Sequence, residues 1–119
     1  MTEPNSNSAI DMELFHEIFG ERENLQRELL NKVCLSITQQ VRGIASSLGA
    51  GNLIVIVEAS HKLKGSALSV GLTSLGNVCD AIELAARAAQ VDTVSALQER
   101  FQIEADRACL ALAEIQNQY

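Results

Sequence analysis

The feature that most constrains how this chain folds is an apolar stripe that runs through residues 25–48. Its members recur at steps of three or four residues: Leu25, Leu29, Val33, Ile37, Val41, Ile44 and Leu48. Residues at this spacing share one side of an α-helix, and the positions between them carry mostly polar side chains. The stripe therefore predicts a long amphipathic helix, which ends at the glycine-rich sequence GAGN of residues 49–52.

Periodic apolar residues predict four further helices, over residues 10–19, about 53–70, 75–89 and 94 to nearly 119. Gly20 and Gly71 close the first and third of the five helices, and a break is expected at residues 90–93. Four long helices after one short helix predict an all-α fold, an antiparallel up-down four-helix bundle with a short N-terminal helix. Residues 1–8 are expected to be a disordered leader, and residues 9–119 the single bundle domain.

The sequence LIVIVEAS of residues 53–60 is the one stretch that reads locally as a β-strand, because its residues are largely β-branched. The chain offers no second strand with which it could pair, and the pattern continues without a turn signal into HKLKGSALSV. This segment is therefore predicted to be helical.

Composition excludes several functional classes. A net charge of -6 argues against nucleic acid or an anionic membrane as partner, and no segment approaches the ~20 apolar residues of a membrane span. The three cysteines lie far apart without a C-x-x-C pair, so neither a disulfide framework nor a zinc site is expected. We expect a cytoplasmic monomer. The short length of the chain and its own Met1 favour the interpretation that it is a free-standing protein.

The third predicted helix carries a histidine, His61, on the side away from the core. At about 100° per residue, the opposite side collects the apolar core residues Ile56, Ala59, Leu63, Ala67 and Val70. At neutral pH an exposed imidazole is substantially uncharged and keeps one nitrogen lone pair, so it can act as a nucleophile. Lys64, three residues later, projects to the same face and can neutralise anionic oxygens there.

Gly65 stands one turn after His61, although glycine inside a helix costs about 1 kcal/mol relative to alanine. The missing side chain would leave room for whatever approaches the imidazole. Apolar residues on this otherwise wet face predict a docking surface around the histidine. Its candidate residues are Ile54, Val57, Glu58, Lys62 and Leu68.

At these residues the sequence resembles the histidine-containing phosphotransfer (HPt) domain family. The family motif H-x-L-K-G-S-[SA] is matched by His61, Leu63, Lys64, Gly65, Ser66 and Ala67, and the similarity extends over about residues 10–115. The resemblance implies a bundle that receives a phosphoryl group on His61 from an aspartate of a receiver domain and passes it to another receiver aspartate. It implies that Lys64 steadies the phosphoryl group and that Gly65 lets the receiver approach.

The chain has no glycine-rich phosphate loop and no acidic metal cluster on the His61 face. By this interpretation it binds no cofactor and has no kinase activity of its own, and Mg²⁺ is held by the partner receiver domain. The partners are then receiver domains of response regulators and hybrid histidine kinases.

Two alternatives stay open. One is a helical adaptor that binds a receiver domain or kinase through Ile54, Val57 and Leu68 without taking phosphate. The other, weaker alternative is a metal site that uses His61 and His16. Asp80 and Glu83, on the fourth predicted helix, are expected to form a solvated face, although a polar contact near the docking surface is compatible with their positions.

Overall fold

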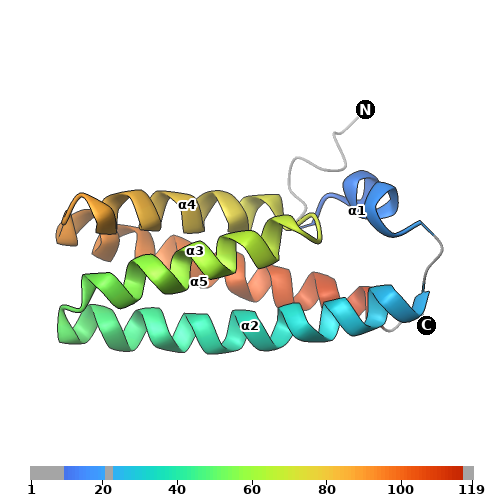
Figure 1. Cartoon of the computed structure of the whole chain (residues 1–119), viewed down its shortest axis with the longest axis horizontal. Coiled ribbons are helices and arrows are strands. Elements are labelled where there is room, and N and C mark those ends of the chain that lie inside the picture. Colours follow the sequence, from blue (N-terminus) through green and yellow to red (C-terminus); the bar gives the residue numbers. More distant parts are fainter. Residues whose placement is uncertain (1–9, 21–22, 117–119) are drawn as a thin grey trace.

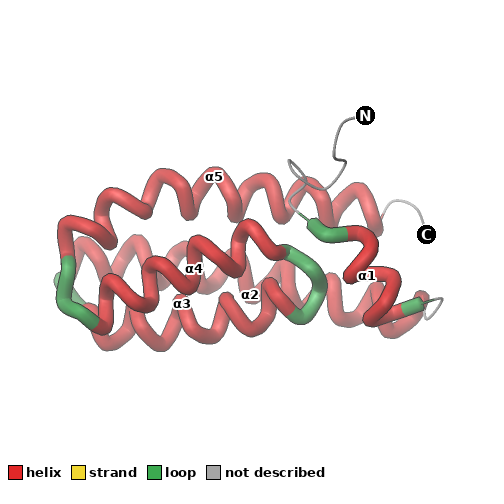
Figure 2. Tube along the Cα trace, turned by 90° about the horizontal axis from the view of Figure 1, so that it is seen from above, coloured by secondary structure: helices red, strands yellow, loops and turns green. Residues whose placement is uncertain are grey.

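The computed structural model describes residues 10–20 and 23–116, without the side chains of residues 18–19, 23–26 and 116. The predicted leader, residues 1–8, lies outside this part of the chain. The described elements are helices, in the order α1 (Met12–Phe19), α2 (Glu23–Ala50), α3 (Leu53–Leu68), α4 (Thr73–Arg87) and α5 (Val91–Gln116). The four long helices lie side by side and alternate in direction, and α1 sits at the end of the bundle near the α3–α4 connection (Figures 1 and 2). The predicted all-α bundle is confirmed.

The helix ends follow the local chemistry of the sequence. The Asp11 side chain accepts a hydrogen bond from the Leu14 amide at 3.0 Å, and Asn52 accepts one from the Val55 amide at 3.3 Å. These two side chains satisfy amides that have no partner within α1 and α3. The β-branched sequence at the start of α3 is thus helical, as expected, and its N-terminus is capped.

One predicted boundary is wrong. The break expected at residues 90–93 is shorter, since α4 ends at Arg87 and α5 already begins at Val91. Ala89 takes a left-handed conformation, with φ 56°, which turns the chain within three residues. Asp92 and Thr93, which belong to the expected break, occupy the first turn of α5 instead.

The loop between α3 and α4 is fixed to the start of α1. Gly71 has φ 82°, and its carbonyl oxygen accepts a hydrogen bond from the Asp11 amide at 2.7 Å. A Cβ atom at this position would lie 2.9 Å from the Asp11 carbonyl oxygen, so both the conformation and the close approach require glycine. This contact places the short helix across the bundle end, where the Phe15 side chain is buried.

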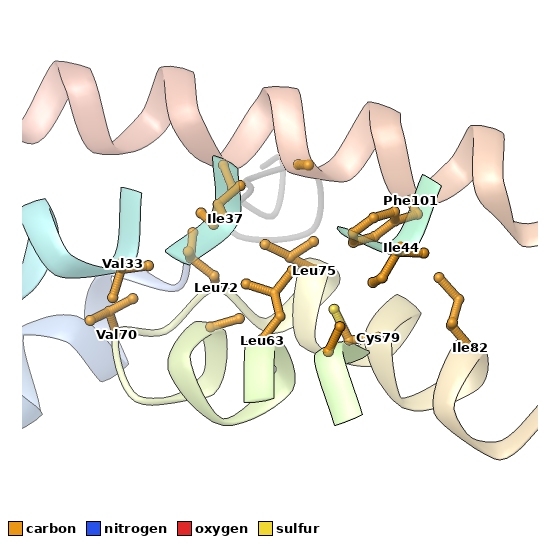
Figure 3. Packing of buried hydrophobic residues seen from close by; sticks show 14 of the residues in the cluster. Val33, Ile37, Ile44, Leu63, Val70, Leu72, Leu75, Cys79, Ile82 and Phe101 are labelled. Atoms are coloured by element: carbon orange, nitrogen blue, oxygen red, sulfur yellow. The ribbon is translucent and has the colours of Figure 1, made fainter. Parts of the chain in front are cut away.

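A single core of apolar, mostly aliphatic side chains runs along the axis of the bundle (Figure 3). All four long helices contribute, for example through Ile37, Leu63, Ile82 and Phe101. The core side predicted for α3 is confirmed, because Ile56, Ala59, Leu63, Ala67 and Val70 are all buried. None of the described helices combines the length and the apolar character that a membrane crossing requires.

Candidate functional site

The predicted nucleophile, His61, lies on the outer side of α3, where this helix packs beside α4 (Figure 2). Its side chain is 64% exposed. The helical phase explains this position, because the opposite side of α3 is committed to the core. The imidazole is accessible to another protein.

The imidazole is held from behind by Glu83 of α4. Nδ1 of His61 lies 3.1 Å from Oε1 and 3.2 Å from Oε2 of this carboxylate. An ionised carboxylate only accepts hydrogen bonds, so Nδ1 must carry the proton and donate it. In the neutral ring the lone pair then resides on Nε2. The contact therefore leaves Nε2 as the ring nitrogen available to a reaction partner.

Glu83 is buried, with only 7% of its side chain exposed, and three cationic or polar groups surround it. Arg87 donates to Oε2 through Nη2 at 2.8 Å and Nε at 3.0 Å, and Nζ of Lys64 lies 3.0 Å from Oε1. Burial by itself raises the pKa of this carboxyl, but the hydrogen bonds from Arg87, Lys64 and His61 outweigh it and lower the pKa to about 2. Glu83 is thus a carboxylate throughout the physiological range.

The prediction of a solvated face for Asp80 and Glu83 is wrong for Glu83, and the polar contact near the docking surface is found instead. The physical reason is the register of α3 against α4, which places this carboxylate between the side chains of His61 and Lys64. Asp80, one turn earlier on α4, remains 51% exposed and accepts a hydrogen bond from Nζ of Lys64 at 3.1 Å.

Lys64 lies on the same face as His61, but its ammonium group is not free. It bridges Asp80 and Glu83, and its side chain is only 25% exposed. The hydrogen bond from Nζ to Glu83 contributes most to a raised pKa of this lysine, and the hydrogen bond to Asp80 contributes next, so the side chain is fully charged. The structure thus brings Lys64 to the site and binds it to two carboxylates of α4.

Gly65 occupies an exposed position on α3, and the space above it is open. Apart from its chain neighbours and the backbone of its own helix, no heavy atom would lie within 4 Å of a Cβ atom at this residue. No packing within the described chain therefore requires a glycine here.

The predicted docking residues all reach the surface to some degree. Ile54, Glu58, Lys62 and Leu68 are exposed, and Val57 is half-buried. Of these, Ile54, Val57 and Glu58 line a groove of about 530 Å³ between the first turns of α3 and the end of α4, together with Leu53, Ala86 and Arg87. The site thus combines an exposed, oriented histidine with an adjacent surface that is partly apolar.

Leu68 lies at the other end of this face and packs against α4. A Cβ atom on Gly76 would approach the Leu68 side chain to 2.5 Å, so the absence of a side chain at Gly76 accommodates this leucine. The contact lets a large residue lie close to α4 while part of it stays exposed.

The metal alternative gains no support. Across residues 10–20 and 23–116, no group of three or more His, Cys, Asp or Glu side chains is placed to hold an ion. His16 belongs to α1, at the bundle end, and His61 to α3. The three cysteines are free thiols.

Comparisons with known proteins agree with this geometry. The family model of the Hpt domain matches residues 28–117. The fold resembles the crystal structure of histidine-containing phosphotransfer protein B (HptB) from Pseudomonas aeruginosa PAO1, with a TM-score of 0.88 and 21% identity over 96% of this chain and 99% of that one. No curated protein sequence matches the chain significantly. The chain belongs to the Hpt domain family, whose members are histidine phosphotransfer proteins of phosphorelays.

Proposed function

We propose that this chain carries a phosphoryl group on Nε2 of His61, accepting it from the aspartyl phosphate of one receiver domain and giving it to an aspartate of another. The observation that carries the proposal is the hydrogen bond from Nδ1 to the buried carboxylate of Glu83. It leaves the lone pair on the ring nitrogen that is not engaged by this carboxylate.

The proposed step is a direct displacement at phosphorus. The Nε2 lone pair forms the N–P bond, and the P–O bond of the acyl phosphate breaks with its electron pair returning to the aspartate carboxylate. The ring keeps its Nδ1 proton and becomes positively charged, next to the ionised Glu83. Because this carboxylate is already in place, little reorganisation is needed as the charge develops.

The receiver domain is proposed to dock on the face formed by α3 and α4. Ile54, Val57 and Leu68 offer apolar contacts, while Glu58 and Lys62 supply charges around them. The open space above Gly65 would admit the receiver's active site towards the imidazole. Lys64 would steady the phosphoryl oxygens, and Mg²⁺ would be held by the receiver.

The test is intact mass spectrometry after incubation with phosphorylated receiver domains and Mg²⁺. We expect an acid-labile, phosphate-sized mass increase for wild type, none for His61→Gln, and an unchanged increase for the matched control His16→Gln. Retention of the increase in His61→Gln would refute the assignment. If wild type and His61→Gln bind receivers equally and neither takes phosphate, the chain is an adaptor.

We also propose that the exchange takes place in the cytoplasm and that the chain acts as a monomer.

A further inference from the structure

The ion pair between Lys64 and Asp80 is not needed to orient His61, which is the task of Glu83. Nζ of Lys64 lies 3.1 Å from Oδ1 of Asp80, which is half exposed at the surface of α4. Lysine has a long flexible stem, and Lys64 stands three residues after His61, so the same ammonium group can swing towards a phosphoryl group on the imidazole. Asp80 therefore competes with the phosphoryl group for this cation.

The charges of the site are balanced before phosphorylation. Asp80 and Glu83 are negative, Lys64 and Arg87 are positive, and both cations are bound to carboxylates. A phosphoryl group adds about -1.5 to -2 charges at pH 7. It arrives beside a site whose described cations are already engaged, and the carboxylate of Asp80 repels it.

We propose that Asp80 sets the phosphoryl-transfer potential of His61 by retaining Lys64 in the unphosphorylated state. This inference rests on the proposed function. When phosphate is present on Nε2, Lys64 must give up its bond to Asp80 in order to reach it, and the freed carboxylate stays close to the new negative charge. Both effects destabilise the phosphohistidine relative to the receiver's aspartyl phosphate, so the group remains easy to pass on. No atom of Asp80 enters the N–P or P–O bond change.

The test is the equilibrium of phosphoryl exchange between this chain and a phosphorylated receiver domain with Mg²⁺, read by intact mass. Asp80→Asn is expected to shift the equilibrium towards phospho-His61 by about three- to tenfold, as expected for removal of one nearby surface charge. The pair is partly exposed, so its loss should leave the helical circular dichroism and the melting temperature nearly unchanged.

Three matched variants separate this role from a general charge effect. Glu99→Gln removes one negative charge from the exposed surface of α5 and should leave the equilibrium as in wild type. Asp80→Glu keeps a carboxylate within reach of Lys64 and should restore nearly the wild-type value. In a Lys64→Met background the effect of Asp80→Asn should shrink, because only direct repulsion remains.

The outcomes distinguish this inference from the proposed function. If wild type takes no phosphate from any receiver, the proposed function fails. If wild type is phosphorylated but Asp80→Asn matches wild type or Glu99→Gln, or lowers the phosphohistidine fraction, the role of Asp80 is overturned while the carrier function stands.

Discussion

At the scale of single residues, Glu83 determines which nitrogen of His61 carries the proton and which keeps the lone pair. The bond at 3.1 Å involves Nδ1, and the carboxylate is itself fixed by Arg87 and Lys64. A histidine on an exposed helix face would otherwise exchange between tautomers and rotate freely. In the proposed reaction the buried carboxylate acts through the imidazole, as a positioning residue.

Replacing this carboxylate is expected to slow phosphorylation without removing the acceptor. Glu83→Ala should lower the rate of phosphate incorporation on His61 by about tenfold to a hundredfold, the scale observed when a metal-bound histidine loses the carboxylate that orients it. Glu83→Gln should lose less, because an amide oxygen still accepts the Nδ1 proton. Imidazole ¹⁵N NMR should show the Nδ1–H tautomer in wild type and a mixture in Glu83→Ala. Wild-type rates in Glu83→Ala would contradict this role.

The same carboxylate predicts a pH dependence of stability. Its pKa is lowered from 4.5 to about 2 in the folded chain, so the folded state binds this proton more weakly than the unfolded state. The resulting stabilisation is fully present above about pH 4.5 and is lost as the pH falls towards 2. In urea unfolding, the free-energy difference between wild type and Glu83→Gln should shrink from pH 6 to pH 3. A difference that stays constant over this range would disprove the linkage.

At the scale of helices, sequence periodicity and helix register contribute different information. The 3.6-residue period of α3 was sufficient to place His61 and Gly65 outward and Leu63 in the core. It contains no information on how α3 is shifted along α4. The pairing of His61 with Glu83 depends on that shift, and so does the contact between Leu68 and Gly76.

The pattern does contain one usable signal for the missed residues. Asp80, Glu83 and Arg87 recur at steps of three and four on α4, so they share one face of that helix. A mixed-charge face opposite a predicted acceptor histidine is a candidate for the groups that support it. Without the register of the two helices, this face is equally consistent with an ordinary solvated surface, and the sequence alone does not distinguish the two.

Replacement of Gly65 by alanine is expected to have opposite effects on the stability of the chain and on its phosphorylation by a receiver. Gly65→Ala places a methyl group in open space on a helix, so the free energy of unfolding should rise by up to ~1 kcal/mol. The same methyl group should slow phosphorylation by a receiver, because it occupies the space through which the partner approaches. Equilibrium urea unfolding measures the first effect, and the rate of phosphoryl transfer from a phosphorylated receiver measures the second.

The matched control for this glycine is Gly43→Ala on α2. A Cβ atom there also meets no heavy atom within 4 Å, so the gain in stability should be similar. The transfer rate should stay at the wild-type value, since Gly43 lies on a different helix from His61. Equal transfer rates for Gly65→Ala and wild type would show that the glycine does not serve access.

At the scale of the whole molecule, charge is distributed unevenly. The net charge of the chain is -6, yet the charged residues of α3 and α4, which are Glu58, Lys62, Lys64, Asp80, Glu83 and Arg87, comprise three acidic and three basic side chains. The excess of negative charge therefore resides on the rest of the chain. The proposed docking face is the neutral part of an acidic protein, which suits a partner whose active site holds an anionic aspartyl phosphate.

This distribution predicts that the rate of association with a receiver depends more on where a charge lies than on the net charge of the chain. Lys62→Glu makes the docking face acidic and should slow association with a phosphorylated receiver several-fold at low salt, an effect that weakens above about 0.2 M salt as screening increases. Arg42→Glu changes the net charge equally, but on the exposed surface of α2, and should slow association much less. Stopped-flow association rates at two ionic strengths measure both. If the two variants slow association equally, long-range net charge rather than the α3–α4 face controls the encounter.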